Sequence, residues 1–241
     1  MRSILAVGAL TLLAACGGEG TTTGNAAAPG QQAASVAAPQ GQRWSETVVE
    51  TPEGGYRMGN PDAAVKLVEY GSRTCPACAA FAGDGFEPLV GMVDTGRVSF
   101  EFRDFLIHGA PDLASAILGR CGGTEPFFPL LEQMYANQSA TLDRLQNLSP
   151  AVQAQLQSMT PQQQITGIAE QAGYLDFVKQ RGIADAQARQ CLADTATVDK
   201  LVKTTESATE VTGTPSFFLN GEKIEAVSWP QVQEALRNAG A

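Results

Sequence analysis

Two cysteines separated by two residues stand in the stretch "VEYGSRTCPACAAF", residues 68–81. Cys75 and Cys78 follow an apolar, strand-like run and precede a helix-like one. If Pro76 is the first helical residue, free N–H groups and the positive end of the helix dipole face the Cys75 sulfur and favour its thiolate. Cys78, one turn into the helix, can then attack a mixed disulfide on Cys75 and release it. The spacing predicts a redox-active pair.

Two other interpretations of this pair are open on spacing alone. A metal site needs a second pair of ligands, and Cys121 and Cys191 have no close partners in the sequence. A structural bridge between Cys75 and Cys78 would do no chemistry. The pair follows a predicted parallel strand, at the end where open α/β sheets place their active sites, and this favours redox chemistry. We therefore expect no metal and no cofactor beyond the cysteine pair itself.

Composition excludes several classes of function. The chain has 241 residues, of which 44% are hydrophobic, enough for a single sizeable core or for one core with an insertion. Its formal net charge is −9 and no basic run stands out, so nucleic acid is not expected as a partner. The single histidine, His108, argues against most zinc, copper and haem sites and against Ser-His-Asp hydrolases. We expect His108 on the surface or in a loop.

The N-terminus, "MRSILAVGALTLLAACGGEG", has the features of an export signal. Its apolar stretch, residues 4–15, is shorter than the about 20 residues that span a bilayer. Leu-Ala-Ala-Cys resembles the bacterial lipobox, which implies removal of residues 1–15 and lipidation of Cys16. An uncleaved anchor, or a signal peptide cut elsewhere, is the alternative. Gly17 replaces the Asp that marks inner-membrane retention in proteobacterial lipoproteins, which favours the outer membrane.

Residues 16–43 and 44–241 differ in character. The first segment is rich in Gly, Ala, Thr, Gln and Pro and has few bulky apolar residues, which predicts a flexible tether. In the second, strands at 63–72 and 97–107 flank a helix at 76–94, which predicts a βαβ unit with a parallel, buried sheet. Asn220-Gly221 predicts a tight hairpin, followed by a helix with Ser228 as N-cap. Helical spacing over about 111–209 predicts an inserted helical subdomain in this α/β frame.

A second motif, Thr214-Pro215 in "VTGTPSFFLNG", stands far from the cysteines in sequence. With both motifs in this order, residues 59–240 resemble the DsbA-like branch of the thioredoxin-fold oxidoreductases of the bacterial envelope. The resemblance implies a thioredoxin fold with an inserted helical subdomain. It also implies a cis peptide bond before Pro215 and a Thr214 backbone that pairs with the substrate. A trans bond is the common alternative for any X-Pro pair.

The resemblance extends to two further features. It implies that Glu69, six residues before Cys75, moves protons for Cys78; the alternative is a solvent-facing glutamate on a strand. It also allows a structural disulfide between Cys121 and Cys191. An oxidising compartment, and an even number of cysteines once Cys16 is lipidated, favour this bridge over two buried free thiols.

Between the cysteines stand Pro76 and Ala77, where strongly oxidising members of this family have Pro-His and thioredoxin has Gly-Pro. We expect the Cys75 pKa to lie between the limits of about 3.5 for DsbA and about 7 for thioredoxin. The resemblance implies an enzyme that faces the periplasm, introduces disulfides into exported polypeptides and is recycled by a membrane redox partner. A disulfide reductase or isomerase, and a peptide-binding module without catalysis, are the alternatives.

Overall fold

The computed structural model describes residues 32–241, and its elements follow the predicted strand, helix and strand. These are β3 (Val65–Gly71), α1 (Pro76–Asp94) and β4 (Val98–Asp104), and the two strands are parallel. Along β3 the buried positions alternate through Val65, Leu67 and Glu69, as a strand with one covered face requires. Cys16 and the predicted signal peptide lie outside the described residues.

The complete sheet has six strands in the order β1-β2-β4-β3-β5-β6, and β3 with β4 is its one parallel pair among the residues described. The added strands are β1 (Val48–Glu50), β2 (Tyr56–Gly59), β5 (Ser216–Leu219) and β6 (Glu222–Ile224), and the short 3-10 helix η1 (Trp44–Glu46) precedes β1. The predicted hairpin joins β5 to β6, with φ of 52° at Asn220 and 91° at Gly221. Both values suit the left-handed turn expected of Asn-Gly.

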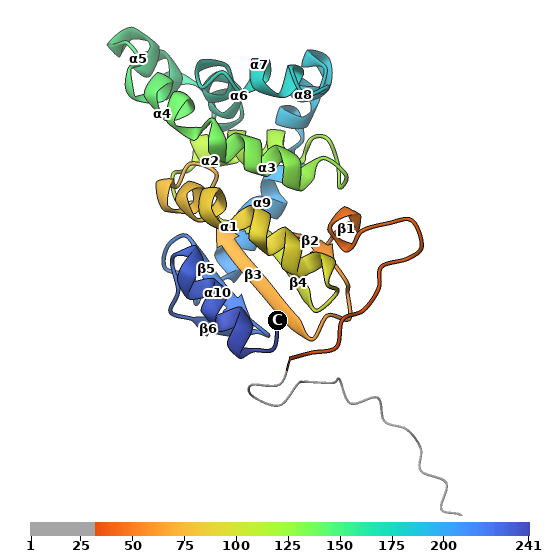
Figure 1. Ribbon diagram of the computed structural model, residues 1–241. Coiled ribbons are helices and arrows are strands. Elements are labelled where there is room, and N and C mark those ends of the chain that lie inside the picture. Colours follow the sequence, from red (N-terminus) through yellow and green to blue (C-terminus); the bar gives the residue numbers. More distant parts are fainter. Residues whose placement is uncertain (1–31) are drawn as a thin grey trace, which may run out of the picture.

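The predicted helical subdomain lies between β4 and β5, and Figure 1 shows it beyond one end of the sheet. Its helices are α2 (Ala110–Arg120), α3 (Phe127–Ala136), α4 (Gln138–Gln146), α5 (Pro150–Ser158), α6 (Pro161–Gln171), α7 (Tyr174–Lys179), α8 (Asp185–Ala193) and α9 (Thr195–Ser207). The last helix, α10 (Trp229–Asn238), begins at Ser228 as predicted. In the part of the chain that the structure describes, no helix is both long and apolar enough to cross a membrane.

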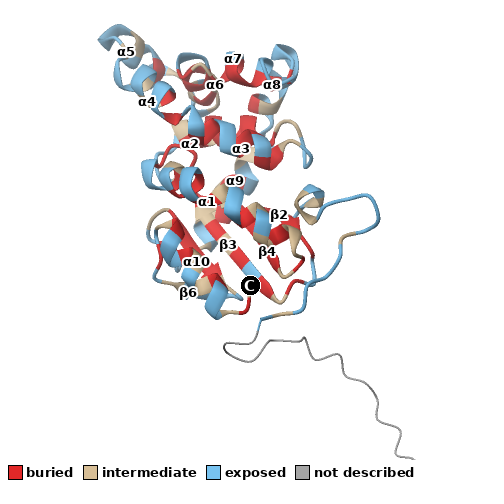
Figure 2. Cartoon of the chain, in the orientation of Figure 1, coloured by how far each residue is buried: buried red, intermediate tan, exposed pale blue. Residues whose placement is uncertain are grey.

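The two largest groups of buried side chains form the cores of the sheet and of the helical subdomain. Figure 2 shows buried residues in both parts of the chain. The sheet core packs β2, β3, β4 and β5 against α1 and α10. Phe127, Phe128 and Tyr135 of α3 also belong to it, although α3 is part of the inserted subdomain. The insertion therefore shares apolar surface with the sheet beside the N-terminal end of α1.

A disulfide joins Cys121, just after α2, to Cys191 of α8, as the resemblance allowed. The alternative of two free thiols is therefore wrong. Their Cα atoms lie 5.8 Å apart, and the sequence separation is 70. The free cysteines within residues 32–241 are Cys75 and Cys78.

Residues 33 and 36, which belong to the predicted tether, make backbone contacts with the domain. The N–H of Ala33 donates to Gly240 O at 2.8 Å, and that of Val36 donates to Thr95 O at 3.1 Å. The indole N–H of Trp44 in turn donates to Val36 O at 2.7 Å. Composition did not indicate these contacts because backbone groups make them, and such bonds need no bulky side chain.

Asp104, the last residue of β4, is a buried carboxylate between two buried arginines. Its Oδ1 accepts from Arg73 Nε and its Oδ2 from Arg120 Nε, each at 2.8 Å. Burial would raise the pKa of Asp104, but the charges of Arg73 and Arg120 hold it below its ordinary value. Arg73 belongs to the loop before Cys75 and Arg120 ends α2. One carboxylate thus joins the cysteine loop, the sheet and the helical subdomain.

We predict that Asp104→Asn lowers the free energy of unfolding by about 3–5 kcal/mol, because the buried Arg73 then lacks a charged partner and the buried Arg120 keeps only Glu50, at 3.9 Å. Denaturant unfolding of the reduced protein measures this. Asp94→Asn is the matched control, since Asp94 pairs at 3.5 Å with Arg43, whose side chain is 63% exposed. The control should lose no more than about 1 kcal/mol. Equal losses for the two variants would contradict the role given to Asp104.

We also predict that replacing both Cys121 and Cys191 by Ser lowers the free energy of unfolding by about 4 kcal/mol, since the bridge closes a loop of about 70 residues. Thiol exchange by Cys75 in the folded protein should be unchanged, because the bridge lies within the helical subdomain. Denaturant unfolding and an exchange assay below the transition test the two halves of this expectation. A loss of exchange at unchanged stability would contradict it.

Candidate active site

Cys75 occupies the N-cap position of α1, and Pro76 is the first helical residue. Pro suits that position because its missing N–H would have no partner there. The N–H groups of Ala77 and Cys78 face the Cys75 sulfur. Cys75 is 6% exposed, Pro76 and Ala77 are exposed, and Cys78 is completely buried. A partner sulfur arriving from solvent therefore reaches Cys75 and not Cys78.

The loop before β5 faces Cys75 from the other side. Its Thr214–Pro215 peptide bond is cis, so the trans alternative does not apply. The Cys75 thiol donates to Thr214 O at 3.2 Å. Thr214 Oγ1 has no hydrogen-bond partner in the described chain, and it is placed to donate to Cys75 once that sulfur is a thiolate. The two motifs, far apart in sequence, meet here.

The surroundings of the two sulfurs push their pKa values in opposite directions. The pKa of Cys75 is lowered to about 5, chiefly because the Cys78 thiol donates a hydrogen bond to it. Thr214 and the N–H groups of Cys78 and Ala77 lower this pKa further, against the effect of partial burial. Burial raises the pKa of Cys78 well above its ordinary value, and the hydrogen bond to Cys75 and the charge of Glu69 add to this. The Cys75 pKa falls within the range expected from the sequence.

Glu69 lies beneath the cysteines on β3 and is 3% exposed, so the solvent-facing alternative is wrong. Burial raises the pKa of Glu69 to about 8, and the charge of Cys75 adds to this effect. Its Oε1 is buried and has no hydrogen-bond partner among residues 32–241. At neutral pH the group is mostly protonated, and so it can exchange a proton with a neighbouring sulfur.

Gln138, the first residue of α4, holds the cysteine loop by its backbone, and sequence reasoning missed it. Its Nε2 donates to Cys75 O at 2.9 Å and to Arg73 O at 3.0 Å. The residue is 6% exposed and comes from the inserted subdomain. Its surroundings in sequence carry no motif, and only the three-dimensional fold brings this amide to the loop.

A second group of polar side chains fixes the residue before Cys75. Thr74 Oγ1 lies 2.5 Å from Asp112 Oδ1 and 2.7 Å from His108 Nδ1, and Ser72 Oγ donates to the same Asp112 oxygen at 2.7 Å. His108 is exposed in a loop, as predicted, but that loop borders the cysteines. Asp112 also accepts from the N–H groups of Ile107 and His108, each at 2.6 Å.

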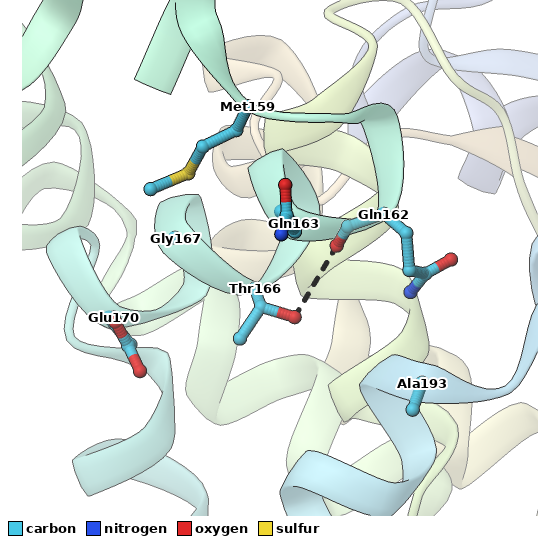
Figure 3. Close-up of a pocket in the computed structure, with 7 residues that line it drawn as sticks. All are labelled: Met159, Gln162, Gln163, Thr166, Gly167, Glu170 and Ala193. Atoms are coloured by element: carbon cyan, nitrogen blue, oxygen red, sulfur yellow. Dashed lines mark hydrogen bonds between the residues drawn. The ribbon is translucent and has the colours of Figure 1, made fainter. Parts of the chain in front are cut away.

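A hollow of about 360 Å³ lies elsewhere, in the helical subdomain (Figure 3). It is lined by Met159, Gln162, Gln163, Thr166, Gly167, Glu170 and Ala193. Its one carboxylate, Glu170, already pairs with Arg189 at 2.7 Å. Across residues 32–241, no three His, Cys, Asp or Glu side chains gather as a metal site would require. The hollow therefore offers no chemistry comparable to that of the cysteines.

Comparison with known protein families agrees with this geometry. The family model described as "Thioredoxin" matches residues 51–238. The chain belongs to the thioredoxin family. Among members with curated names, the "Putative protein-disulfide oxidoreductase" of Rickettsia bellii is 28% identical over 189 residues, which cover 76% of this chain and 63% of the relative. A relative with the same description in Rickettsia prowazekii is 29% identical over 189 residues, which cover 76% of this chain and 60% of the relative. The chain thus spans less than two thirds of these relatives.

Solved structures of thioredoxin-fold proteins match the same region. The protein-disulfide isomerase from Novosphingobium aromaticivorans superimposes with a TM-score of 0.72 at 28% identity, covering 78% of this chain and 98% of that one. Alpha-DsbA1 of Wolbachia pipientis superimposes with a TM-score of 0.60 at 20% identity, covering 76% of this chain and 89% of that one. At this identity the match shows a similar fold and no more. The thioredoxin fold with a helical insertion, expected from the sequence, is confirmed.

We predict that Cys78→Ala raises the Cys75 pKa above its value in Cys78→Ser, because Ser keeps a donor to the Cys75 thiolate and Ala does not. The rate of alkylation of Cys75 against pH measures this. Only the thiolate reacts, so with a pKa of about 5 the rate is level at neutral pH and falls about tenfold per unit below the pKa. The fall should begin at a higher pH in the Ala variant. Coinciding profiles would contradict the donor role of Cys78.

Proposed function

We propose that the protein is a thiol–disulfide oxidoreductase that introduces disulfides into exported polypeptides through Cys75 and Cys78. The observation that carries the proposal is the pairing of an accessible sulfur of low pKa with a buried one of high pKa. The cis-proline loop faces the first of them. A binding module without catalysis would have no use for two thiols whose surroundings differ in this way.

The exchange proceeds in two balanced steps. A substrate thiolate attacks Cys75 Sγ of the oxidised pair, the bond between Cys75 and Cys78 breaks, and Cys78 leaves as a thiolate that takes up a proton. A second substrate thiolate then attacks the substrate sulfur of the mixed disulfide, and Cys75 leaves as a thiolate. Two electrons pass from the substrate to the cysteine pair. Thr214, with its free hydroxyl, lies beside Cys75. Cys75 is the sulfur that is attacked in the first step and the sulfur that leaves in the second.

The low pKa of Cys75 favours the oxidising direction. A stabilised thiolate stabilises the reduced protein, which makes the oxidised protein a better oxidant. Isomerase activity is the second candidate, because the Novosphingobium structure with a TM-score of 0.72 carries that name. The two activities differ in their substrates: an oxidase acts on reduced polypeptides, and an isomerase restores activity to a protein with scrambled disulfides.

The proposed location rests on the N-terminal sequence. Lipidation of Cys16 after removal of residues 1–15 would hold the domain on the periplasmic side of the bacterial envelope, with Gly17 favouring the outer membrane. Reoxidation of the pair would require a membrane redox partner. Blocking the lipoprotein signal peptidase tests this arrangement, since it should leave a precursor about 15 residues longer.

We predict that Cys78→Ser accumulates mixed disulfides with disulfide-containing polypeptides from an envelope extract, because the Cys75 thiolate attacks their disulfides and no second thiol releases the product. Cys75→Ser should trap nothing and should lose all exchange. Non-reducing gels followed by mass spectrometry of the trapped species measure this. Equal trapping by the two variants would contradict the assigned roles.

Insulin reduction by dithiothreitol separates the enzyme from a binding module. The unmodified chain should accelerate it, and Cys75→Ser should give the rate of the reductant alone. Oxidation of a reduced peptide and reactivation of a scrambled protein then distinguish the two directions. Reactivation without net oxidation would favour the isomerase.

A further inference from the structure

Tyr135 of α3 has a buried hydroxyl that nothing in the fold explains. The residue is 6% exposed, and its Oη has no hydrogen-bond partner in the part of the chain described. Phenylalanine would fill the same volume without leaving a polar atom unsatisfied, so the hydroxyl costs stability where it stands. A buried hydroxyl without a partner is free to donate to a neighbouring group that becomes charged during the reaction.

The hydroxyl belongs to the same part of the core as Glu69 and Cys78. The rings of Tyr135 and Phe102 meet edge-on at 6.4 Å, and Phe102 lies opposite Glu69 in the parallel pairing of β4 with β3. Glu69 Oε1 turns toward the end of β3, since a side chain at Gly71 would come within 2.8 Å of it and would also meet the Phe102 ring. Cys78 closes the same core from α1.

The charges around Tyr135 support this placement. Burial raises the pKa of Tyr135 well above its ordinary value, and negative charge on Cys78 and Glu69 raises it further. Arg73 acts in the opposite direction, and Asp104 acts in the same direction as Cys78. These four groups come from α1, β3, the cysteine loop and β4. The hydroxyl therefore stays protonated and can donate to whichever neighbour is charged.

Two of the three groups have a polar atom without a partner. Glu69 Oε1, like Tyr135 Oη, makes no hydrogen bond within residues 32–241, and Cys78 is wholly buried. Cys78 must gain a proton when the redox disulfide opens and lose one when it closes. Bulk water does not reach a completely buried sulfur, so this proton has to travel through neighbouring side chains.

We propose that the Tyr135 hydroxyl passes this proton between Cys78 Sγ and the Glu69 carboxyl group, directly or through one water molecule. In the mixed disulfide Cys75 carries no charge, which removes one of the two causes that raise the Glu69 pKa. When the disulfide closes, Cys78 gives its proton to Tyr135 Oη and Tyr135 gives its own to Glu69 in its ionised form. The Cys78 thiolate then attacks Cys75 Sγ of the mixed disulfide, and the partner leaves as a thiolate. When the disulfide opens, the same protons move in reverse. The inference rests on the proposed oxidoreductase function.

Stopped-flow reaction of the reduced full chain with oxidised glutathione tests the relay, because it resolves two phases. Cys75 attacks glutathione in the first phase, and Cys78 displaces glutathione from Cys75 in the second. We expect Tyr135→Phe to leave the first phase within twofold of its normal rate and to slow the second about tenfold or more, a loss in keeping with one proton-transfer group. Its melting temperature should be equal to that of the unmodified chain or higher.

Two further variants sharpen the test. Glu69→Gln should also slow the second phase, and adding Tyr135→Phe to it should slow that phase little more, because groups in one relay act as a unit. Tyr174→Phe is the matched control: Tyr174 is another buried tyrosine of the insertion, but it belongs to the core of the helical subdomain. Its two phases should keep their normal rates. Fully additive losses in the double variant would overturn the relay.

The remaining outcomes are equally decisive. A normal second phase in Tyr135→Phe, with an active unmodified chain, would overturn this inference alone. Absence of any exchange by the unmodified chain would overturn the proposed function and the relay with it. If Tyr135→Phe does not fold, a fluorinated tyrosine at position 135 keeps the shape and lowers the pKa of the hydroxyl. It should change the rate of the second phase, and an unchanged rate would overturn the relay.

Discussion

The carboxylate of Asp104 is the constraint on which the site depends. A single buried carboxylate binds two buried guanidinium groups, one through each oxygen: Arg73 of the cysteine loop and Arg120 at the end of α2. Moving either arginine away from Asp104 would leave a buried charge without its main partner, so this contact fixes the loop, the sheet and the insertion relative to one another. Arg73 also lies 5.1 Å above the Phe127 ring, which extends the constraint to α3. The position of Cys75 follows from these contacts together with the amide of Gln138.

Above this rigid base, burial and hydrogen bonding separate the ionisation of neighbouring acids. Cys75 is surrounded by donors and is charged at neutral pH, whereas the Glu69 carboxyl group beneath it has lost water and keeps its proton. Neighbouring acidic groups whose pKa values are shifted in opposite directions are a common basis of acid–base chemistry in proteins. Here the same arrangement keeps the negative charge on the sulfur that solvent can reach.

The sequence was sufficient for those features whose cause is local. Pro76 after Cys75, Asn220-Gly221 between two apolar runs and Ser228 before α10 each act within a few residues, and all three predictions agree with the structure. Strands β1 and β2 were missed because they are short and gain stability only by pairing with β4. Asp104, Gln138 and Tyr135 lie in ordinary helical or strand patterns. Their significance arises from contacts across 16 to 65 positions of sequence, which no local pattern encodes.

The backbone contacts of residues 33 and 36 fix where the described chain begins on the domain. These residues bond to Gly240 and to Thr95, and Thr95 directly follows α1. Cys75 lies at the opposite end of the same helix, whose 19 residues at 1.5 Å each span about 28 Å. Helix α1 therefore acts as a rigid spacer between the backbone contacts of residues 33 and 36 and the reactive sulfur. The first residues that the structure describes lie at one end of this spacer, and the chemistry takes place at the other.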